Sequence, residues 1–350
     1  MASLAVERMR STVAGRSAGQ HGAGVKSAVQ LSSHPVPFQG IGQQGTIFYM
    51  DPEAISVVIP TFNGGASLGR AVASALAQSI PPLEIIVVDD ASSDESTAEA
   101  LRDPRLRVIR HAVRAGPAAA RNTGIANARG KWVAFLDSDD EWAPRKLELQ
   151  LATLRSSSSQ MQACTTGYTI VDQRYGTTRT FLPERSHISA EGLLWGCVLS
   201  PGSTLMAARR VFNEVAMFDE RLQRLEDWDW LMRFSRHHTL AFVSRPMATI
   251  YKNSNPSSAD VLNAITLLRR VHGDYWNSRS RLNGRKFESS LLLEEAAAAY
   301  YDNNRKRAAF LLLRMFSVYP WRDAAFFAMV LRQGRETLAG ILTRRAQRIE

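Results

Sequence analysis

Between residues 55 and 140 the chain alternates short strand-like segments with segments of helical periodicity, and this alternation limits the possible folds. Four strand-like segments cover residues 55–61, 84–88, 106–110 and 132–136. Apolar residues at helical spacing follow the first of them, which predicts a helix over residues 66–79, and a second helix is expected over residues 117–128. Strands that alternate with helices in this way predict an α/β fold with a mostly parallel, doubly wound sheet.

Three of these strands end in polar residues. Pro60 and Thr61 close the first strand, Asp89 and Asp90 the second, and an acidic run at residues 137–140 the fourth. Because open α/β sheets bind ligands at the carboxyl ends of their strands, we expect these groups to share one crevice. One strand that ends in Asp is common, but three in one half-sheet are difficult to explain by solvation alone.

The acidic run Asp137-Ser138-Asp139-Asp140 directly follows an apolar strand. Carboxylates this dense are rarely buried without partners. Mg²⁺ or Mn²⁺ held by one or two carboxylates, with water and phosphate oxygens in the other positions, fits the pattern. A solvated acidic turn is the simpler interpretation of an isolated Asp-x-Asp.

The composition is that of a soluble globular protein with an anionic partner. The chain is 45% hydrophobic and carries 43 Lys+Arg against 33 Asp+Glu, a formal net charge of +10. Its two cysteines, Cys164 and Cys197, have no metal-ligand spacing. No apolar run approaches the roughly 18 residues of a spanning helix, and the N-terminus lacks the apolar core of a signal peptide. We therefore expect a cytoplasmic protein, and leave open a peripheral contact with the inner face of the cell membrane.

Six motifs follow one another in a fixed order. They are ISVVIPTFN (55–63), EIIVVDDASSD (84–94), AARNTGIA (119–126), WVAFLDSDD (132–140), GSTLM (202–206) and LEDWDWL (225–231). No Gly-x-Gly-x-x-Gly follows the first strand and no Gly-Lys-Ser/Thr loop is present, which argues against a dinucleotide cofactor and a P-loop. The ordered set resembles a family 2 glycosyltransferase with the GT-A fold.

The resemblance implies a GT-A doubly wound mixed sheet and an inverting sugar transfer. The donor would be a nucleotide-diphosphate sugar, with a UDP-sugar expected. The acceptor would be a hydroxyl of a saccharide or lipid-linked saccharide in polysaccharide or glycoconjugate synthesis. Nucleic acid is not expected as a partner.

The resemblance also implies roles for the strand ends that bind the donor. Pro60, Thr61 and Phe62 would seat the nucleotide base, and Asp90 would accept a hydrogen bond from it. Asp89 could equally be a buried turn cap. Arg121 would lie near the diphosphate, although an arginine on this helix could equally be a surface residue.

For the metal, a divalent Mn²⁺ or Mg²⁺, the resemblance implies that Asp139 is the direct ligand. Asp137 would lie nearer the ribose or a metal-bound water, and the role of Asp140 is open. A histidine ligand often follows an aromatic such as Tyr251 in the family. Here Lys252 follows instead, and it could face the diphosphate.

The second acidic motif, Glu226-Asp227-Trp228-Asp229, opens a helix predicted over residues 227–238. The helix dipole favours acids in a first turn, so simple capping is one interpretation. The resemblance implies instead that Asp227 is the catalytic base. Glu226 and Asp229 would be its electrostatic surroundings and raise its proton affinity.

Outside the GT-A domain at residues 54–255, two regions are expected. The composition of residues 1–53 predicts a disordered extension. Residues 256–350 predict a separate basic helical region, whose residues 303–350 hold 10 basic and 3 acidic residues, hence a net charge of +7. Its last helix could lie on an anionic membrane or pack on the catalytic domain. The histidines outside the motifs, including His237 and His238, are expected at the surface.

Two other functions remain open from the sequence. A nucleotidyltransferase would share the metal and base-binding crevice, but it needs a basic loop for the triphosphate, and none follows the first strand. A catalytically inactive module could dock on membranes through its basic tail.

Overall fold

The structure is a computed structural model that describes residues 53–94, 103–156, 161–253 and 257–320. The predicted extension before Glu53 and the last predicted helix, beyond Pro320, lie outside the described residues. The strands are β1 (Ile55–Thr61), β2 (Glu84–Asp89), β3 (Leu106–Arg110), β4 (Trp132–Phe135), β5 (Glu141–Trp142), β6 (Met161–Asp172), β7 (Thr177–Phe181), β8 (Met206–Ala208) and β9 (Thr239–Lys252). The helices are α1 (Gly65–Leu76), α3 (Pro117–Asn127), α4 (Lys146–Ser156), α5 (Arg185–Ile188), the 3₁₀ helix η2 (Gly192–Trp195), α6 (Pro201–Thr204), α7 (Val211–Glu214), α8 (Glu226–Phe234), α9 (Ser258–Arg279), α10 (Arg281–Tyr301) and α11 (Arg305–Val318).

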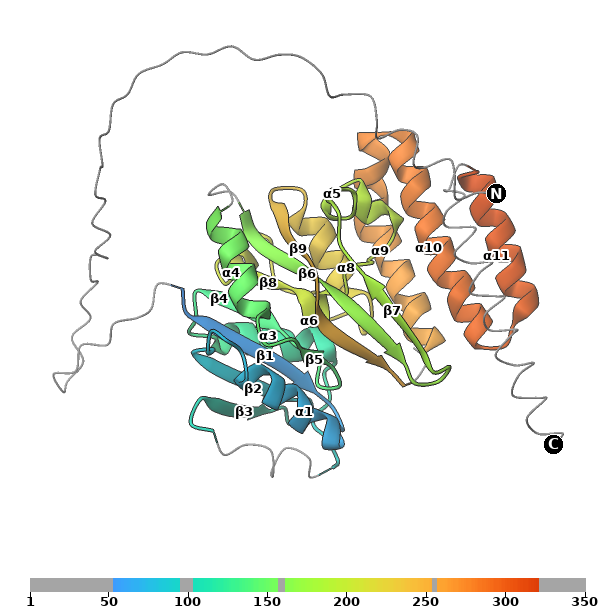
Figure 1. Ribbon diagram of the computed structural model, residues 1–350. Coiled ribbons are helices and arrows are strands. Elements are labelled where there is room, and N and C mark those ends of the chain that lie inside the picture. The colour runs from blue at the N-terminus through green and yellow to red at the C-terminus, as the bar shows by residue number, and fades with distance from the viewer. Residues whose placement is uncertain (1–52, 95–102, 157–160, 254–256, 321–350) are drawn as a thin grey trace, which may run out of the picture. The chain divides into compact units, whose positions relative to one another are not determined.

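The described strands form one mixed sheet in the order β3-β2-β1-β4-β8-β6-β9-β5, with β7 paired to β6 (Figure 1). β1 runs parallel to β2 and β4, and β2 runs parallel to β3. β8 is antiparallel to both β4 and β6. The predicted α/β class with a doubly wound mixed sheet is confirmed, and α1 and α3 begin and end within three residues of their predicted bounds.

The central strands are buried on both faces, which explains why their sequences are mostly apolar. Every residue of β1, β2 and β4 is buried, whereas β3 at the edge of the sheet is largely exposed. Helix α3 packs closely on β1, since a Cβ added at Gly124 would lie 2.3 Å from Cγ1 of Val58. Only glycine allows the helix, and with it Arg121, to approach the sheet this closely.

The helices after residue 256 share the core of the sheet. Val261, Leu268 and Trp276 of α9 and Leu291 of α10 belong to the same buried apolar cluster as β1, β2 and β4. In addition, the hydroxyl of Ser290 donates to the carbonyl of Leu194 in η2. The helices after residue 256, which the sequence predicts as a separate region, therefore share one hydrophobic core with the sheet.

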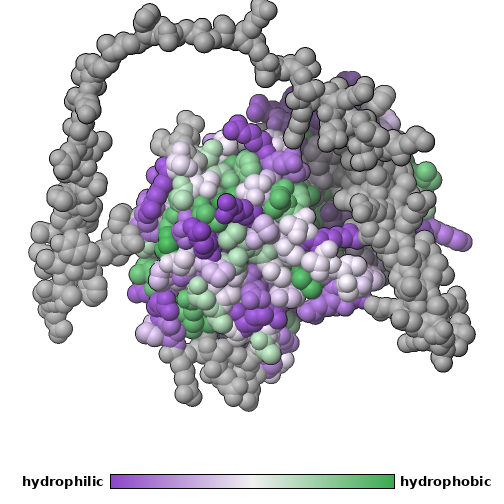
Figure 2. Space-filling model, in the orientation of Figure 1, coloured by the Kyte–Doolittle hydropathy of each residue, from purple (hydrophilic) through white to green (hydrophobic). Residues whose placement is uncertain are grey.

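Helix α11 packs differently from α9 and α10. It lies beside α10 (Figure 1), and the two share a smaller cluster that includes Leu292, Ala296, Leu311 and Met315. Within the described ranges no helix combines the length and the apolar composition that crossing a bilayer requires. On the face that Figure 2 shows, hydrophilic and hydrophobic side chains are interspersed.

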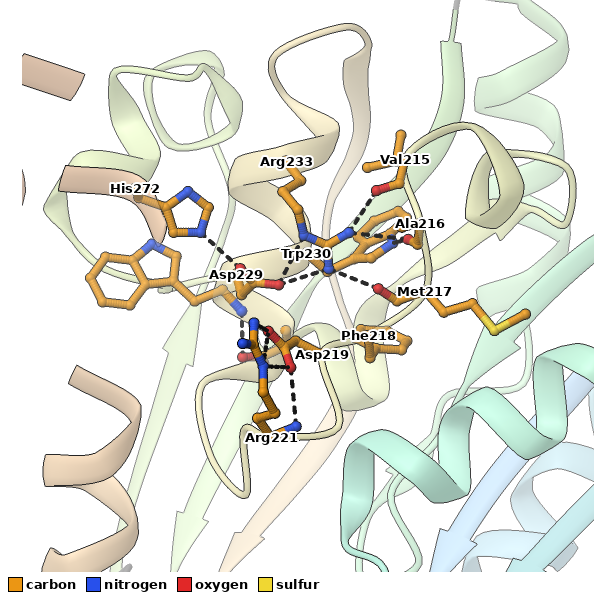
Figure 3. Close-up of polar contacts among 12 residues, drawn as sticks. Val215, Ala216, Met217, Phe218, Asp219, Arg221, Asp229, Trp230, Arg233 and His272 are labelled. Atoms are coloured by element: carbon orange, nitrogen blue, oxygen red, sulfur yellow. Dashed lines mark hydrogen bonds and ion pairs between the residues drawn. The ribbon is translucent and has the colours of Figure 1, made fainter. Parts of the chain in front are cut away.

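A buried charge network joins α8 to α9 (Figure 3). Oδ1 of Asp229 lies 2.8 Å from Nε2 of His272, and Oδ2 accepts hydrogen bonds from Nε (2.9 Å) and Nη2 (2.7 Å) of Arg233. Arg233 also donates to the carbonyls of Val215 and Met217. The network thus fixes the first turn of α8 against α9 and against the chain that precedes the helix.

The expectation that the histidines outside the motifs lie at the surface is wrong for His272. Its side chain is completely buried, while His237 is exposed and His238 is half-buried beside Phe234. The sequence gives no warning of this, because the partner of His272 lies 43 residues away on another helix.

The charge of Asp229 stabilises the folded state. Burial alone would raise the pKa of this carboxyl, but the hydrogen bond from His272 and the charge of Arg233 outweigh burial and lower it. A lowered pKa means that the stabilisation is present above the ordinary pKa of Asp, about 3.9, and is lost as the pH falls through the folded-state value.

We expect Asp229→Asn to lower the free energy of unfolding by about 3 to 5 kcal/mol, because it removes the buried carboxylate that pairs with His272 and with the half-buried guanidinium of Arg233. Urea unfolding at pH 7 measures the loss. Asp219→Asn is the matched control, since Asp219 pairs with the exposed side chain of Arg221 (Figure 3) and should cost about 1 kcal/mol or less. Equal losses in the two variants would contradict a structural role for the buried network.

Candidate active site

The polar ends of β1, β2 and β4 lie at one edge of the sheet. Thr61 is the register partner of Asp89, and the amide of Asp90 donates to the carbonyl of Thr61 over 2.8 Å. After β4, the amide of Leu136 donates to the carbonyl of Val58, so the acidic run leaves the sheet beside the same strand. The parallel pairing therefore brings the predicted donor-binding groups to neighbouring positions.

The end of β1 presents an aromatic surface. Pro60 and Thr61 are buried, whereas Phe62 is exposed, and the guanidinium of Arg114 lies 3.9 Å from the centre of the Phe62 ring. The buried hydroxyl of Thr61 has no hydrogen-bond partner among the described residues. An exposed aromatic ring at the end of a strand is an arrangement suited to stacking with a planar heterocycle.

The two carboxylates after β2 have different surroundings. Asp89 is buried, and its Oδ1 accepts a hydrogen bond from the amide of Ser92 over 2.9 Å. Its Oδ2 lies 3.2 Å from Nη1 of Arg110. These contacts are those of a turn cap, the alternative that the sequence left open for Asp89.

Asp90 fixes the loop that leads into α3. Its Oδ1 accepts from the amide of Ala115 (2.8 Å) and from Nδ1 of His111 (2.8 Å), and its Oδ2 accepts from the amide of Gly116 (2.7 Å). A carboxylate has about four acceptor positions, so at most one remains for a ligand. The contacts of Asp90 in the structure are thus mainly with its own chain.

Arg121 connects the acidic run to the first turn of α8. Its side chain is only 6% exposed, Nη2 donates to Oδ1 of Asp137 over 2.6 Å, and Nη1 donates to Oε1 of Glu226. Burial lowers the pKa of the guanidinium, but the charges of Asp137, Glu226 and Asp227 outweigh burial and raise it, so the group stays charged. The surface position that the sequence also allowed for Arg121 is excluded.

Within the acidic run the three carboxylates differ in burial. Asp137 and Asp139 are half-buried, while Asp140 is buried and accepts hydrogen bonds from the hydroxyl of Ser203 (2.5 Å) and the amide of Tyr251 (3.1 Å). The role of Asp140, open from the sequence, is thus to attach the turn after β4 to α6 and β9. Ser203 and Tyr251 lie within or next to recognised motifs, but only the fold shows which carboxylate they hold.

Asp137 and Asp139 offer the hard oxygen donors that Mg²⁺ and Mn²⁺ prefer. The carboxylate of Asp139 takes no hydrogen bond from another described residue, and burial together with the charge of Asp137 raises its pKa. A cation would relieve both effects. No group of three His, Cys, Asp or Glu side chains able to hold a metal occurs in the described part of the chain, so water and phosphate oxygens would complete the coordination.

The acids of α8 point to different partners. Leu225, in the left-handed conformation with φ 61°, precedes the helix as its N-cap, so Asp227 is not the capping residue. Burial and the charge of Glu226, opposed by Arg121, raise the pKa of Asp227 to about 7. Asp229, expected as part of the surroundings of Asp227, pairs instead with His272 and Arg233. The neighbouring carboxylate whose charge raises the pKa of Asp227, in addition to burial, is that of Glu226.

Lys252 ends β9 and is exposed, directly after Tyr251, whose amide is held by Asp140. Its backbone carbonyl accepts from the amide of Gln173 over 3.1 Å. Whether its side chain faces a diphosphate stays a prediction.

Comparison with known proteins gives sequence relatives that are glycosyltransferases. The model of the family described as glycosyl transferase family 2 matches residues 56–215. An uncharacterized glycosyltransferase, RP339, of Rickettsia prowazekii (strain Madrid E) is 31% identical over 54% of this chain and 60% of its own length. The putative teichuronic acid biosynthesis glycosyltransferase TuaG of Bacillus subtilis (strain 168) is 39% identical over 51% of this chain and 72% of its own. A glucosyltransferase of Escherichia coli, named UDP-Glc:alpha-D-GlcNAc-diphosphoundecaprenol beta-1,3-glucosyltransferase WfgD, is 36% identical over 30% of this chain and 42% of its own.

Among solved structures, the crystal structure of S. aureus TarS is similar with a TM-score of 0.54 and 17% sequence identity, over 76% of this chain and 55% of TarS. This likeness concerns the fold. Several of the relatives are longer than the matched part, and the chain spans 60% of the length of the Rickettsia prowazekii protein. The motif order, the mixed sheet and the extent of the match to TuaG together show that the chain belongs to glycosyl transferase family 2.

Proposed function

We propose that the chain transfers a sugar, with inversion, from a UDP-sugar to a hydroxyl of a saccharide or lipid-linked saccharide. The observation that carries this proposal is the buried guanidinium of Arg121, which contacts both Asp137 and Glu226. It ties the acidic run, suited to the diphosphate end of a donor, to the turn that holds Asp227. The leaving group and the base thus belong to one site.

The donor would lie along the carboxyl ends of β1, β2 and β4. The base would stack near Phe62, with Pro60, Thr61 and Asp90 around it. Asp89 would cap the turn after β2 that holds Asp90 in place. The exposed ring of Phe62 supports this placement. Arg121, charged and buried, would hold Asp137 in position and contribute positive potential near the diphosphate.

The metal, Mn²⁺ or Mg²⁺, would be held by Asp139, with Asp137 beside the ribose or a metal-bound water. When bound, it would neutralise negative charge on the leaving diphosphate. The raised pKa of Asp139 supports this assignment, as does the absence of a hydrogen bond to its carboxylate from another described residue.

Asp227 would remove the proton from the acceptor hydroxyl while the hydroxyl attacks the anomeric carbon on the face opposite the leaving diphosphate. A base that works near neutral pH needs a raised pKa, and burial together with Glu226 supplies it. Inversion rests on the family resemblance.

The names of relatives support the substrate class. WfgD is named for transfer from UDP-Glc to a lipid-linked GlcNAc, TuaG for teichuronic acid synthesis, and ExoO of Rhizobium meliloti (strain 1021) for succinoglycan biosynthesis. A TarS structure in complex with UDP-GlcNAc has the same fold. Polysaccharide or glycoconjugate synthesis in the cytoplasm, at the inner face of the membrane where a lipid-linked acceptor lies, is the setting we propose. Membership of a glycosyltransferase family leaves the nucleotidyltransferase hypothesis without support.

Asp227→Asn should leave folding and donor affinity nearly unchanged while it lowers transfer by at least about a hundredfold, the usual contribution of a general base. Turnover, UDP affinity and melting temperature are measured on one sample with a panel of UDP-sugars and acceptors. Asp274→Asn, on the exposed side of α9, is the matched control and should retain full turnover. Near-normal turnover of Asp227→Asn would reject Asp227 as the base.

The pH dependence of kcat/KM gives an independent test of the base. Asp227 acts deprotonated and its pKa is raised to about 7, so kcat/KM should fall about tenfold per pH unit below pH 7 and level off above it. A rate that stays constant from pH 7 down to pH 5.5 would show that no group with this pKa limits the reaction.

Asp139→Asn should abolish the metal-dependent part of UDP binding while the protein stays folded. Calorimetric titration of UDP with and without Mn²⁺ measures it. Asp103→Asn is the control, because Asp103 pairs only locally with Arg105 at the surface. If Mn²⁺ strengthens UDP binding equally in Asp139→Asn and in the parent, Asp139 is not the ligand.

A further inference from the structure

A cavity of about 260 Å³ lies where the C-terminal end of α8 meets α9 and α10. Its lining residues come from four segments: Ala190, Glu191, Ser235, Arg236, Tyr275, Trp276, Arg279 and Asn283. None of the residues proposed above for donor binding, metal binding or catalysis lines it. The cavity is therefore a second candidate site.

Two hydrogen-bond donors at this cavity have no acceptor. Nε of Arg236 and Nε1 of Trp276 are buried, and neither has a hydrogen-bond partner among the described residues. A buried donor without a partner costs free energy, and more so when it is charged. Both residues line the cavity, so an oxygen-bearing ligand bound there would lie next to side chains whose donors the described part of the chain leaves unpaired.

The charges at the cavity favour an anion. Two arginines, Arg236 and Arg279, line it against one acid, Glu191. The nearby Arg233 and Asp229 neutralise each other as an ion pair. The lining residues therefore keep an excess of one positive charge. Arg236 is held over the Tyr275 ring at 4.0 Å, which limits the movement of its guanidinium.

The size of the cavity and its remaining polar groups limit the class of ligand that it can bind. A cavity of 260 Å³ is below the roughly 300 to 1,000 Å³ of pockets for drug-sized ligands, so the ligand is small. Guanidinium groups match the oxygens of a phosphate, and the amide of Asn283 and the carboxylate of Glu191 can bind hydroxyl groups. A sugar phosphate combines these features.

The cavity is connected to the turn that holds Asp227. Nη2 of Arg236 lies 2.6 Å from Nδ1 of His272, whose Nε2 lies 2.8 Å from Oδ1 of Asp229. Arginine has only donors, so Nδ1 of His272 accepts and its Nε2 carries the hydrogen that is donated to Asp229. A ligand that binds Arg236 is thus two hydrogen bonds away from the first turn of α8.

We propose that this cavity binds a small phosphate-bearing ligand, of the sugar phosphate class, through Arg236 and Arg279, and that binding is sensed at His272. The site is separate from the donor site. Its ligand acts on the base-bearing helix α8 through the hydrogen bonds of His272 and Asp229.

The test is a calorimetric titration of the full chain with glucose 1-phosphate, inorganic phosphate and glucose. We expect saturable binding of glucose 1-phosphate and weaker binding of phosphate, with no binding of glucose. Arg279→Gln should weaken the binding of glucose 1-phosphate at least about tenfold through the loss of a charge-assisted hydrogen bond. Arg270→Gln, an exposed arginine of the same helix outside the cavity, should bind like the parent.

A second variant keeps the test decisive if Arg279→Gln folds poorly. Asn283→Asp places a negative charge at the cavity in the first turn of α10, where the helix dipole favours an acid, so it should fold and still weaken binding. No saturable binding by the parent, equal binding by glucose, or unchanged affinity in the cavity variants would overturn the proposal.

The link to His272 is tested by NMR of the histidine ring nitrogens during the same titration. The His272 signals should shift with the occupancy of the cavity in the parent and in Arg270→Gln. Saturable binding that leaves the His272 signals unchanged would overturn the connection to α8.

Discussion

The guanidinium of Arg121 is buried between the carboxylates of Asp137 and Glu226, and the geometry of the candidate site depends on this interaction. A buried cation requires pairing, since the cost of removing it from water is recovered only through close opposite charges. The two acids come from the end of β4 and from the first turn of α8. Arg121 itself comes from α3, which reaches the sheet because Gly124 leaves room beside Val58. Removing Arg121 would leave the buried carboxylate of Glu226 and the half-buried carboxylate of Asp137 without their shared counter-charge.

Around this bridge, neutral donors hold the remaining acids in place. Ser203 donates to Asp140, and its hydroxyl also accepts from the amide of Asp137 over 3.1 Å. Gly202 allows this approach, because a Cβ at that position would lie 2.3 Å from Oδ2 of Asp137. Asp139 alone keeps a carboxylate without a partner from another described residue. The acidic run is thus fixed at both sides, while the carboxylate of Asp139, the proposed metal ligand, stays available.

The helices after the sheet take part in the site indirectly. Asp229 lies in the same turn as Asp227, but it binds His272 of α9, and α9 packs into the core of the sheet. The position of the proposed base therefore depends on a helix that carries none of the motifs. The apolar faces of α9 and α10 are buried against the sheet and η2. Amphipathic helices in globular proteins bury their apolar faces in this way, without a membrane.

The sequence by itself determined the order of strands and helices up to β4 and the class of the sheet. Runs such as residues 57–59 and 85–88 are apolar because both of their faces are buried, and this local property can be read directly. It also determined which residues end or follow the strands, among them Thr61, Asp90 and Asp139, since their position along the chain places them there.

The partner of each charged group was decided only by the tertiary structure. Nothing local distinguishes Arg121 from a surface arginine, or directs Asp229 to His272 rather than to Asp227. Nor does the sequence show that the helices after residue 256 belong to the core. These pairings join residues up to 105 positions apart, and burial, which makes each pairing necessary, is a property of the folded chain.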